Sequence, residues 1–292
     1  ITAPPPSSGG VALLQMLGMK ADAAPLFAGR ALNSAQYVHL VAEIEKRVFA
    51  DRAQYLGDPD FAKVPVAALL APDYLARRAR QIDPAKPSPT AAVTPGLEKP
   101  QTTHYSIVDK WGNAVSTTYT LNGEFGSGEV VEGAGFLMND EMDDFSAKPG
   151  APNQFGVVGG AANAIAPGKR PLSSMTPTIL TRNGRVAMVI GTPGGSRIFT
   201  AIFQVLVDAY DFHLPLKAAI DAPRYHHQLL PPDTIYWEPY APFPPGLAAA
   251  LKARGYRLEE GFDTDMAAIE IEGRAPVLAP DPRARGVGLV VP

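Results

Sequence analysis

Residues 101–122, QTTHYSIVDKWGNAVSTTYTLN, form the stretch from which the fold can be worked out. They have the pattern of two β-strands, 104–108 and 114–121, joined by the loop 109–113, DKWGN. The glycine in this loop suits a backbone angle φ above zero, which tight hairpin connections need. We therefore predict a β-hairpin that begins directly after Thr102.

Thr102 gives this hairpin a candidate chemistry. Within a continuous chain its hydroxyl is a poor nucleophile, because no base lies beside it. Cutting the Gln101–Thr102 bond would free an α-amine, with an unperturbed pKa of about 7.7–8.0, within reach of the Thr102 Oγ. Such an amine can act as the general base for a threonine nucleophile. The hypothesis is a chain that cuts itself before it becomes active.

Composition narrows the class of protein. The 292 residues are 46% hydrophobic and 19% charged, which is enough apolar material for a large buried core. A net charge of −3 favours neither nucleic acid nor an anionic membrane as a partner, and no apolar run reaches the ~18 residues of a spanning helix. The absence of cysteine excludes thiol nucleophiles, thiolate metal sites and disulfides. The opening ITAPPPSSGG has neither an initiator Met nor a signal peptide, so we expect the interior of a longer protein.

Helical periodicity fills the region upstream of the hairpin. Residues 11–19 and 74–82 predict short helices, and Asn33 is the expected N-cap of a longer one. Prolines then interrupt residues 83–101, which we expect to form an exposed linker open to cleavage. The apolar stripe of the longer helix comprises Tyr37, Leu40, Val41, Ile44, Val48 and Phe49.

Downstream, strands and helices come as hairpins and helical pairs. Asn183-Gly184 is the strongest hairpin signal, and Ser196 is the expected N-cap of a helix after the turn GTPGG. The long glycine-rich loop 146–171 is an expected functional loop. This order favours an α+β fold with helices on a mainly antiparallel sheet. Further elements are expected as helices at 216–221 and 245–254 and as strands at 136–139, 178–181, 186–191, near Ile235, at 267–271 and at 286–291.

Three groups of residues can be given chemical roles, each with a plain structural alternative. Gly194 and Gly195 lie at a strand-to-helix turn, where backbone N–H groups can bind a developing oxyanion or simply form a tight turn. The acidic cluster 140–144 can bind an ammonium group, or it can be a solvated turn. Ser173 and Ser174 can donate hydroxyls to a carboxylate, or they can belong to an ordinary loop.

Nothing in the sequence indicates a metal site. His226 and His227 are adjacent, and adjacent side chains seldom face the same way, so we interpret both as structural. Neither an HExxH motif nor a calcium-loop spacing is present.

The order of the motifs is more informative than any one of them. From residue 102 to residue 283 the chain resembles the small subunit of the γ-glutamyltranspeptidases, which are N-terminal-nucleophile hydrolases. Upstream, PPPSSGG and ADRAQYLGDPDF resemble the C-terminal part of that family's large subunit. The matching downstream strings are TTHYSIVD, YTLN, MNDEMDDFSAKPG, KRPLSSMTPTI, GTPGGSRI, APRYHHQ and DPR.

This resemblance implies a four-layer αββα sandwich with mainly antiparallel sheets. Residues 1–101, including the linker 83–101, would come from the large-subunit region. Residues 102–292 would form the small-subunit catalytic region, and the two would make one structural domain. The resemblance further implies a heterodimer cut from one precursor and a periplasmic or secreted location.

The resemblance also implies catalytic roles. Thr102 would be the nucleophile both for cleavage of the Gln101–Thr102 bond and for catalysis. Thr120 would orient and help activate it, and Gly194 and Gly195 would form the oxyanion hole. No cofactor is implied.

Binding roles follow from the same matches. Asn122, Glu141 and Asp144 would bind the α-amino end of a γ-glutamyl group, while Ser173 and Ser174 would bind its α-carboxylate. The donor would be glutathione or a related γ-glutamyl amide, and the acceptor would be water, an amino acid or a dipeptide. In the family, a large-subunit arginine that also binds the α-carboxylate lies upstream of anything in this sequence.

Residues 149–160 resemble the lid loop of the family. Phe155 falls where bacterial relatives often carry Tyr, so it would keep the shielding but lose one hydrogen bond. Two alternatives to the transferase remain. A glutaryl or cephalosporin-type β-lactam acylase has substrates without an α-amino group, so Glu141 and Asp144 argue against it. An uncleaved, inactive precursor fragment would give one intact band on a denaturing gel.

Overall fold

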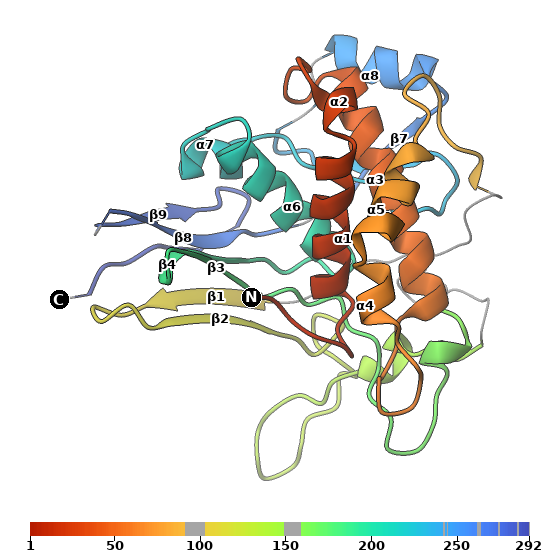
Figure 1. Ribbon diagram of the computed structural model, residues 1–292. Coiled ribbons are helices and arrows are strands. Elements are labelled where there is room, and N and C mark those ends of the chain that lie inside the picture. The colour runs from red at the N-terminus through yellow and green to blue at the C-terminus, as the bar shows by residue number, and fades with distance from the viewer. Residues whose placement is uncertain are drawn as a thin grey trace.

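The computed structural model describes residues 1–90, 103–148, 159–241, 243, 245–261, 264–273, 275–284 and 286–291. Its α-helices are α1 (Gly9–Asp22), α2 (Ala24–Phe27), α3 (Ala35–Tyr55), α4 (Val66–Leu69), α5 (Pro72–Arg80), α6 (Arg197–Tyr210), α7 (Leu216–Asp221) and α8 (Pro245–Ala253) (Figure 1). Two short 3-10 helices are η2 (Glu141–Asp144) and η3 (Ala161–Asn163). The strands are β1 (Thr103–Val108), β2 (Ala114–Tyr119), β3 (Thr178–Arg182), β4 (Arg185–Gly191), β5 (Tyr225–His226), β6 (Thr234–Trp237), β7 (Arg257–Glu260), β8 (Ala267–Glu272) and β9 (Ala275–Pro280).

The longest helix, α3, forms where its apolar stripe predicts it. Ser34 caps the N-terminus, because its hydroxyl accepts a hydrogen bond from the amide of Tyr37 at 3.2 Å. The prediction that Asn33 is the cap is wrong by one residue. Asn33 instead has a φ of 55°, a left-handed conformation that Asn tolerates and that turns the chain into the helix.

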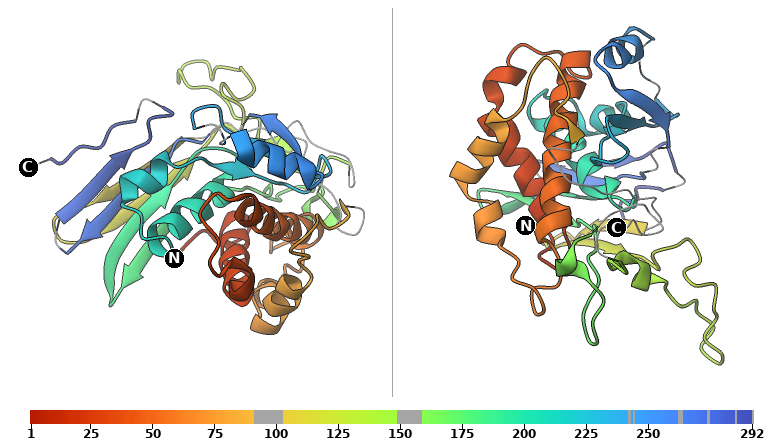
Figure 2. Two further views of the ribbon diagram at one scale, coloured as in Figure 1. Left: turned by 90° about the horizontal axis from the view of Figure 1, so that it is seen from above. Right: turned by 90° about the vertical axis from the view of Figure 1, so that its right-hand side faces the viewer.

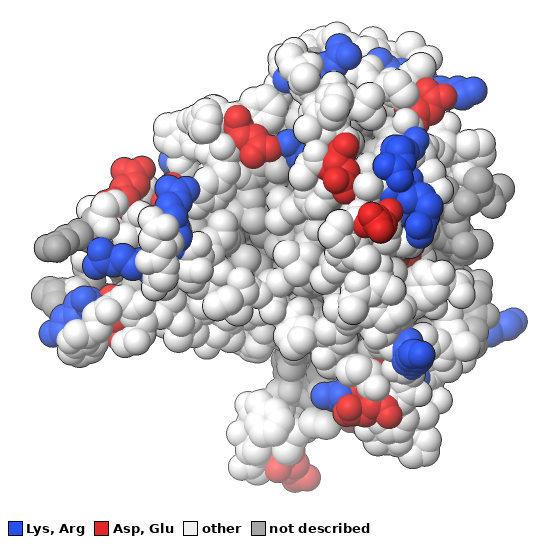
Figure 3. Space-filling model, in the orientation of Figure 1, with Lys and Arg blue, Asp and Glu red and all other residues white. Residues whose placement is uncertain are grey.

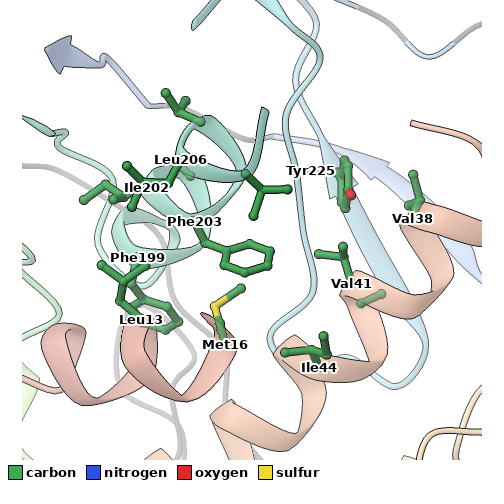
Figure 4. Close-up of a cluster of buried hydrophobic side chains, with 14 of the residues drawn as sticks. Leu13, Met16, Val38, Val41, Ile44, Phe199, Ile202, Phe203, Leu206 and Tyr225 are labelled. Carbon is green, nitrogen blue, oxygen red and sulfur yellow. The ribbon is translucent and has the colours of Figure 1, made fainter. Parts of the chain in front are cut away.

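The main apolar core lies between α1, α3 and α6. Leu13 and Met16 of α1, Ile44 of α3 and Phe199 and Phe203 of α6 belong to one cluster and are at most 2% exposed (Figure 4). Burial of each such side chain stabilises the folded state by about 1.5–3 kcal/mol. This cluster therefore joins the N-terminal helices to the downstream half of the chain.

Four strands form the main sheet in the order β3-β4-β8-β9, and all its neighbouring pairs are antiparallel. The hairpin predicted at Asn183-Gly184 is confirmed, and φ values of 53° and 75° match a type I′ turn. The chain start also lies on this sheet, because the Ile179 amide donates to the Ile1 carbonyl at 3.0 Å. A smaller sheet has the order β5-β6-β7, in which β6 and β7 run parallel.

The predicted β1–β2 hairpin is confirmed and lies against one face of the main sheet (Figures 1 and 2). Helices α6 and α7 lie on the other face, so the layers run helix, sheet, sheet. Polar side chains make part of the contact between the sheets. Ser116 Oγ donates to the Ile190 carbonyl at 3.2 Å, and Ser106 Oγ donates to the Ala267 carbonyl at 3.0 Å.

Two predicted strands are wrong. Residues 286–291 form no strand; β9 occupies the place beside β8 and ends the sheet. Residues 136–139 contain only an isolated bridge between Leu137 and Val130. The nearby Gly133 and Gly135 have φ values of 79° and 74° and turn the chain, and two backbone bonds join the arms of this turn, from the Val131 amide to the Phe136 carbonyl and from the Met138 amide to the Glu129 carbonyl.

Two further expectations need qualification by the contacts. Ser196 is the N-cap residue of α6, as predicted, but its side chain makes no capping hydrogen bond, and its hydroxyl donates to Gln228 Oε1 at 3.1 Å. The expected linker is not freely exposed at its start. Lys46 Nζ donates to the Ser88 carbonyl at 2.8 Å, and Arg47 Nη2 donates to Ser88 Oγ at 2.9 Å, which fixes this part on α3. Residues 91–101 of the linker lie outside the described residues.

Candidate active site

The first candidate residues lie at the end of the hairpin where β1 begins. Thr103 of β1 is the partner of Tyr119 of β2, so Thr120 and Asn122 follow β2 at that same end. Thr120 Oγ1 accepts a hydrogen bond from the Asn122 amide at 2.8 Å. Asn122 is buried and has a φ of 72°, and it therefore turns the chain away from the strand.

The glycine turn reaches the same end of the hairpin through β4. A Cβ on Gly191, the last residue of β4, would lie 2.1 Å from the ring of His104, so the two strands are in direct contact here. Gly194 and Gly195 follow with φ values of 135° and 55°, which favour glycine. Among the described residues, neither glycine amide donates a hydrogen bond to a protein acceptor. Unpaired amides in such a turn can bind an anion.

The ring of His104 beneath this turn is neutral at neutral pH, because burial lowers the pKa of His104 to about 4. Ser106 Oγ already donates to a carbonyl, so it accepts from His104 Nε2 at 3.1 Å. His104 Nδ1 then accepts from Thr118 Oγ1 at 2.7 Å. Sequence reasoning missed this ring. The signal was its inward position on a strand of alternating exposure.

The candidate amine-binding acids lie in and beside η2, directly against Asn122. Asn122 Nδ2 donates to the Asp140 carbonyl at 3.2 Å, and the Gly123 amide donates to Asp140 Oδ1 at 2.7 Å. Burial raises the pKa of Glu141, while a hydrogen bond with Asp144 lowers it and the charge of Asp140 raises it further. Glu141 thus lies close to both Asp144 and Asp140 in a partly buried turn, an environment that suits a cationic ligand.

The candidate carboxylate-binding serines lie in a loop that is held by residues next to the upstream helices. Before the serines, the Arg170 guanidinium forms a two-pronged pair with Asp58, from Nε to Oδ2 at 3.0 Å and from Nη2 to Oδ1 at 2.6 Å. These bonds hold the pKa of Asp58 well below its usual range. At the serines, the Ser8 amide donates to the Ser173 carbonyl at 2.7 Å. Ser174 is 7% exposed.

Asn163 of η3 joins residues 140–144, called here the acid turn, to the loop that contains Ser173 and Ser174, called here the serine loop. Its Nδ2 donates to the Asp144 carbonyl at 2.7 Å, and its Oδ1 accepts from the Leu172 amide at 3.1 Å. The residue is 3% exposed. Sequence reasoning missed Asn163, because its loop has no periodicity, and the only signal was an amide that can donate and accept at once. The acids and the serines therefore belong to one hydrogen-bonded assembly.

Other predicted features are placed as follows. Gln101, Thr102 and Phe155 lie outside the described residues. His226 and His227 are fully buried, and His226 bonds to Thr200 and Gln228, so their structural interpretation is confirmed. The described part of the chain contains no group of three or more His, Asp or Glu side chains arranged to hold a metal ion. No helix there is both long and apolar enough to cross a membrane.

Sequence comparison gives a family match along the whole described chain. The family model for gamma-glutamyltranspeptidase matches residues 1–291. The glutathione hydrolase proenzyme of Pseudomonas aeruginosa is 66% identical over 292 residues, which are 99% of this chain and 52% of that protein. The chain therefore spans about half the length of the curated relatives that it matches.

Structural comparison agrees. The gamma-glutamyltranspeptidase from Pseudomonas nitroreducens, solved in complex with L-DON, has a TM-score of 0.64 and 66% identity, covering 65% of this chain and 100% of that one. The cephalosporin acylase from Bacillus halodurans has a TM-score of 0.75 and 26% identity, covering 97% of this chain and 49% of that one. The α+β fold of the N-terminal-nucleophile hydrolases is thus confirmed. With a family match from its first residue to residue 291, this chain belongs to the gamma-glutamyltranspeptidase family.

Proposed function

We propose that this chain carries the nucleophile and most of the donor site of a γ-glutamyltransferase that also hydrolyses glutathione. One observation carries the proposal: Asn163 holds an acid turn and a pair of serines in one assembly beside the start of β1. The α-carbon of a γ-glutamyl group bears an ammonium and a carboxylate. Recognition of both requires acceptors and donors at a fixed separation, and this assembly supplies them.

The first step is self-cleavage. Thr102 Oγ attacks the carbonyl carbon of Gln101, and the Gln101–Thr102 C–N bond breaks as an ester forms. Water hydrolyses that ester and leaves a carboxylate on Gln101 and a free α-amine on Thr102. Thr120 then orients the Thr102 hydroxyl, and the freed amine accepts its proton as the general base.

The second step transfers the acyl group. Thr102 Oγ attacks the γ-amide carbon of glutathione, and the Gly194 and Gly195 amides bind the developing oxyanion. A hydrogen-bond donor in an oxyanion hole typically stabilises the transition state by about 2.7–4 kcal/mol. The amide C–N bond breaks, and cysteinylglycine leaves with the proton held by the amine. Water or the amine of an amino acid or dipeptide then attacks the ester and regenerates the Thr102 hydroxyl.

The two charged groups on the α-carbon of the donor would face different residues of the site. Its ammonium faces Asn122, Glu141 and Asp144, and its α-carboxylate faces Ser173 and Ser174. The orientation follows from chemistry, because an ammonium group only donates hydrogen bonds and a carboxylate only accepts them. Phe155, in the lid-like segment 149–160, would shield this site from water.

We propose further that, after cleavage, residues 1–101 belong to one subunit of a heterodimer and residues 102–292 to the other. The Pseudomonas aeruginosa relative is named a proenzyme, and this name supports such processing. A periplasmic or secreted location is part of the same proposal. On the face seen in Figure 3, small groups of Lys and Arg and of Asp and Glu are scattered over a mostly uncharged surface. That pattern fits small-molecule substrates better than a polyanion partner.

Acylase activity is the second candidate, because the cephalosporin acylase has a matching structure over nearly all of this chain. The acid turn distinguishes the two. A glutaryl side chain has no ammonium group, so it would make no ionic contact of its own with the carboxylates of Glu141 and Asp144. Comparing glutathione with a glutaryl amide as substrates therefore separates the candidates, and preference for the glutaryl compound would favour the acylase.

The deciding experiment is intact-mass spectrometry of the full-length natural protein over time, followed by an assay with γ-glutamyl donors. Two species dividing between Gln101 and Thr102, with donor turnover, are expected. Thr102→Ala should abolish both, because it removes the nucleophile. Thr103→Ala is the matched control, since Thr103 is an exposed residue of β1, and it should still be cleaved. A single stable mass without turnover would overturn the proposal.

A further inference from the structure

The guanidinium of Arg52 is buried beside the serine loop. Arg52 lies in the last turn of α3 and is 3% exposed. Its Nε donates to Ser8 Oγ at 2.9 Å, and its Nη2 donates to Ser174 Oγ at 3.0 Å. Ser8 Oγ in turn donates to the Ser173 carbonyl at 2.8 Å. Arg52 therefore contacts one serine directly and reaches the other through Ser8.

These bonds fix the direction of both serine hydroxyls. A guanidinium can only donate, so Ser174 Oγ must accept from Arg52. Ser173 Oγ likewise accepts, from the Met175 amide at 3.1 Å. Among the described residues, neither hydroxyl donates to a protein acceptor. The proton of each is available to a ligand, and a carboxylate is the ligand that only accepts.

The charge of Arg52 acts in the same direction. A guanidinium stays protonated throughout the physiological range, so its charge is permanent. In the low dielectric of a buried site, a hydroxyl that accepts a hydrogen bond becomes polarised, and the hydrogen bond that it donates is then stronger. A carboxylate next to Ser174 would therefore meet a polarised hydroxyl with a fixed positive charge behind it.

We propose that Arg52 is a positioning residue for the α-carboxylate of the donor: it holds the Ser174 hydroxyl as an outward donor and sets Ser173 through Ser8. The inference rests on the proposed γ-glutamyl function. Arg52 acts through Ser174, and this separates it from the carboxylate-binding arginine that the family resemblance places upstream of residue 1.

The test compares two donors in the full-length natural protein. One is a γ-glutamyl anilide, and the other is the 4-aminobutyryl anilide, which lacks only the α-carboxylate. Arg52→Gln should lower kcat/KM for the γ-glutamyl anilide by about tenfold, or about 1.4 kcal/mol. Most of the change should be in KM. The 4-aminobutyryl anilide should change by less than about twofold, since a lost orienting bond matters only to a carboxylate.

Two variants show whether the effect passes through the serine. In a Ser174→Ala background the direct contact is already gone, so adding Arg52→Gln should cost only the roughly threefold loss expected for the path through Ser8. Arg52→Lys keeps the charge and one hydrogen-bonding nitrogen, so its kcat/KM for the γ-glutamyl anilide should lie between the values for wild type and Arg52→Gln. Full additivity of Arg52→Gln and Ser174→Ala would overturn the inference.

Arg47→Gln is the matched structural control. Arg47 lies on the same helix and is 2% exposed, but it bonds to Glu43, Ser88 and the Gln81 carbonyl. It should destabilise the fold without distinguishing the two donors. An equal loss of both donors in Arg52→Gln would overturn the inference. If Arg52→Gln fails to fold, Ser8→Ala provides the test, with about a threefold loss expected for the γ-glutamyl anilide alone.

Failure of the proposed function has a different signature. Wild-type protein that neither cleaves nor uses either donor would overturn that function and this inference together. Wild-type protein that cleaves and turns over donors, with Arg52→Gln unable to distinguish them, would overturn this inference alone.

Discussion

The two ends of the donor site are built in different ways. The acid turn takes its hydrogen bonds from neighbours in its own stretch of chain, Asn122 and Asn163 among them. The serine loop depends on distant residues. Ser8 and Ser173 are 165 positions apart, and Arg52 and Ser174 are 122 apart. A substitution far from the substrate can therefore disable the carboxylate end and leave the ammonium end intact.

Removing both serine hydroxyls should have the largest effect. A hydrogen bond to a charged group contributes about 1.5–3 kcal/mol, so Ser173→Ala with Ser174→Ala should reduce kcat/KM for a γ-glutamyl anilide by about 100-fold or more. The double variant also removes the acceptors of the Met175 amide and of Arg52 Nη2, so the melting temperature should fall, and kcat/KM is compared at a temperature where the variant is folded. Near-wild-type efficiency in a folded variant would remove the carboxylate role from this loop.

Asp144→Asn should have the next largest effect, and at the other end. The amide lacks the negative charge that an ammonium group needs, so donors with an α-amine should lose about tenfold in kcat/KM. A glutaryl anilide should lose far less. Asn163 bonds to the backbone carbonyl of Asp144, so the local fold should persist. Equal losses for both donors would contradict the assignment.

Gly9→Ala tests whether the serine loop can be disturbed from a distance. A Cβ at Gly9 would lie 1.9 Å from Thr176 Oγ1 and 2.7 Å from the Ser174 carbonyl oxygen. Overpacking of this kind costs about 1–3 kcal/mol, which should appear in the free energy of unfolding and as a raised KM for γ-glutamyl donors. Gly246→Ala is the control, because its Cβ would meet nothing within 4 Å. If Gly9→Ala and Gly246→Ala had the same free energy of unfolding and the same KM, the serine loop would not depend on distant residues as described.

The smallest effect should be a pH dependence at the acid turn. Burial is the main reason that the pKa of Glu141 is raised above its ordinary value of 4.5. Its negative charge therefore develops later as pH rises, and KM for γ-glutamyl donors should fall as pH passes through that raised value. The free energy of unfolding should also fall over this pH range, since the folded state holds this proton longer than the unfolded state does.

Glu141→Gln checks the pH prediction. It should flatten both profiles measured between about pH 4 and pH 8, because it removes the titrating group. A KM profile identical to that of wild type would assign the pH dependence to another group.

Periodic elements were predictable from the sequence, because their signals are local. The stripe of α3 and the Asn183-Gly184 turn each specify their structure within a few residues. The cap of α3 was placed one residue early, since Asn33 and Ser34 both suit an N-cap and only the backbone conformation separates them. Residues 286–291 show the opposite limit, because a strand-like composition becomes a strand only where it pairs, and the strand beside β8 is β9.

Residues that support the site were not predictable in the same way. Arg52 continues the apolar stripe of α3, four positions after Val48, and a charge at such a position is a sequence signal for a buried partner. The identity of that partner, Ser174, depends on contacts between distant parts of the chain. Asn163 gave no signal beyond its residue type. The positions of Ser173, Ser174 and the acids came from family motifs, and their arrangement came from the structure.

The core shared by α1, α3 and α6 has a consequence for the order of the unfolding reaction. While the chain is continuous, unfolding is unimolecular and its midpoint does not depend on protein concentration. After a cut between residues 101 and 102, Leu13 and Ile44 would lie on one polypeptide and Phe199 and Phe203 on the other, still in one cluster. Unfolding would then release two separate chains, and refolding would require their bimolecular association. The melting temperature would rise with protein concentration only after cleavage, so a dilution series would report the cut without any substrate.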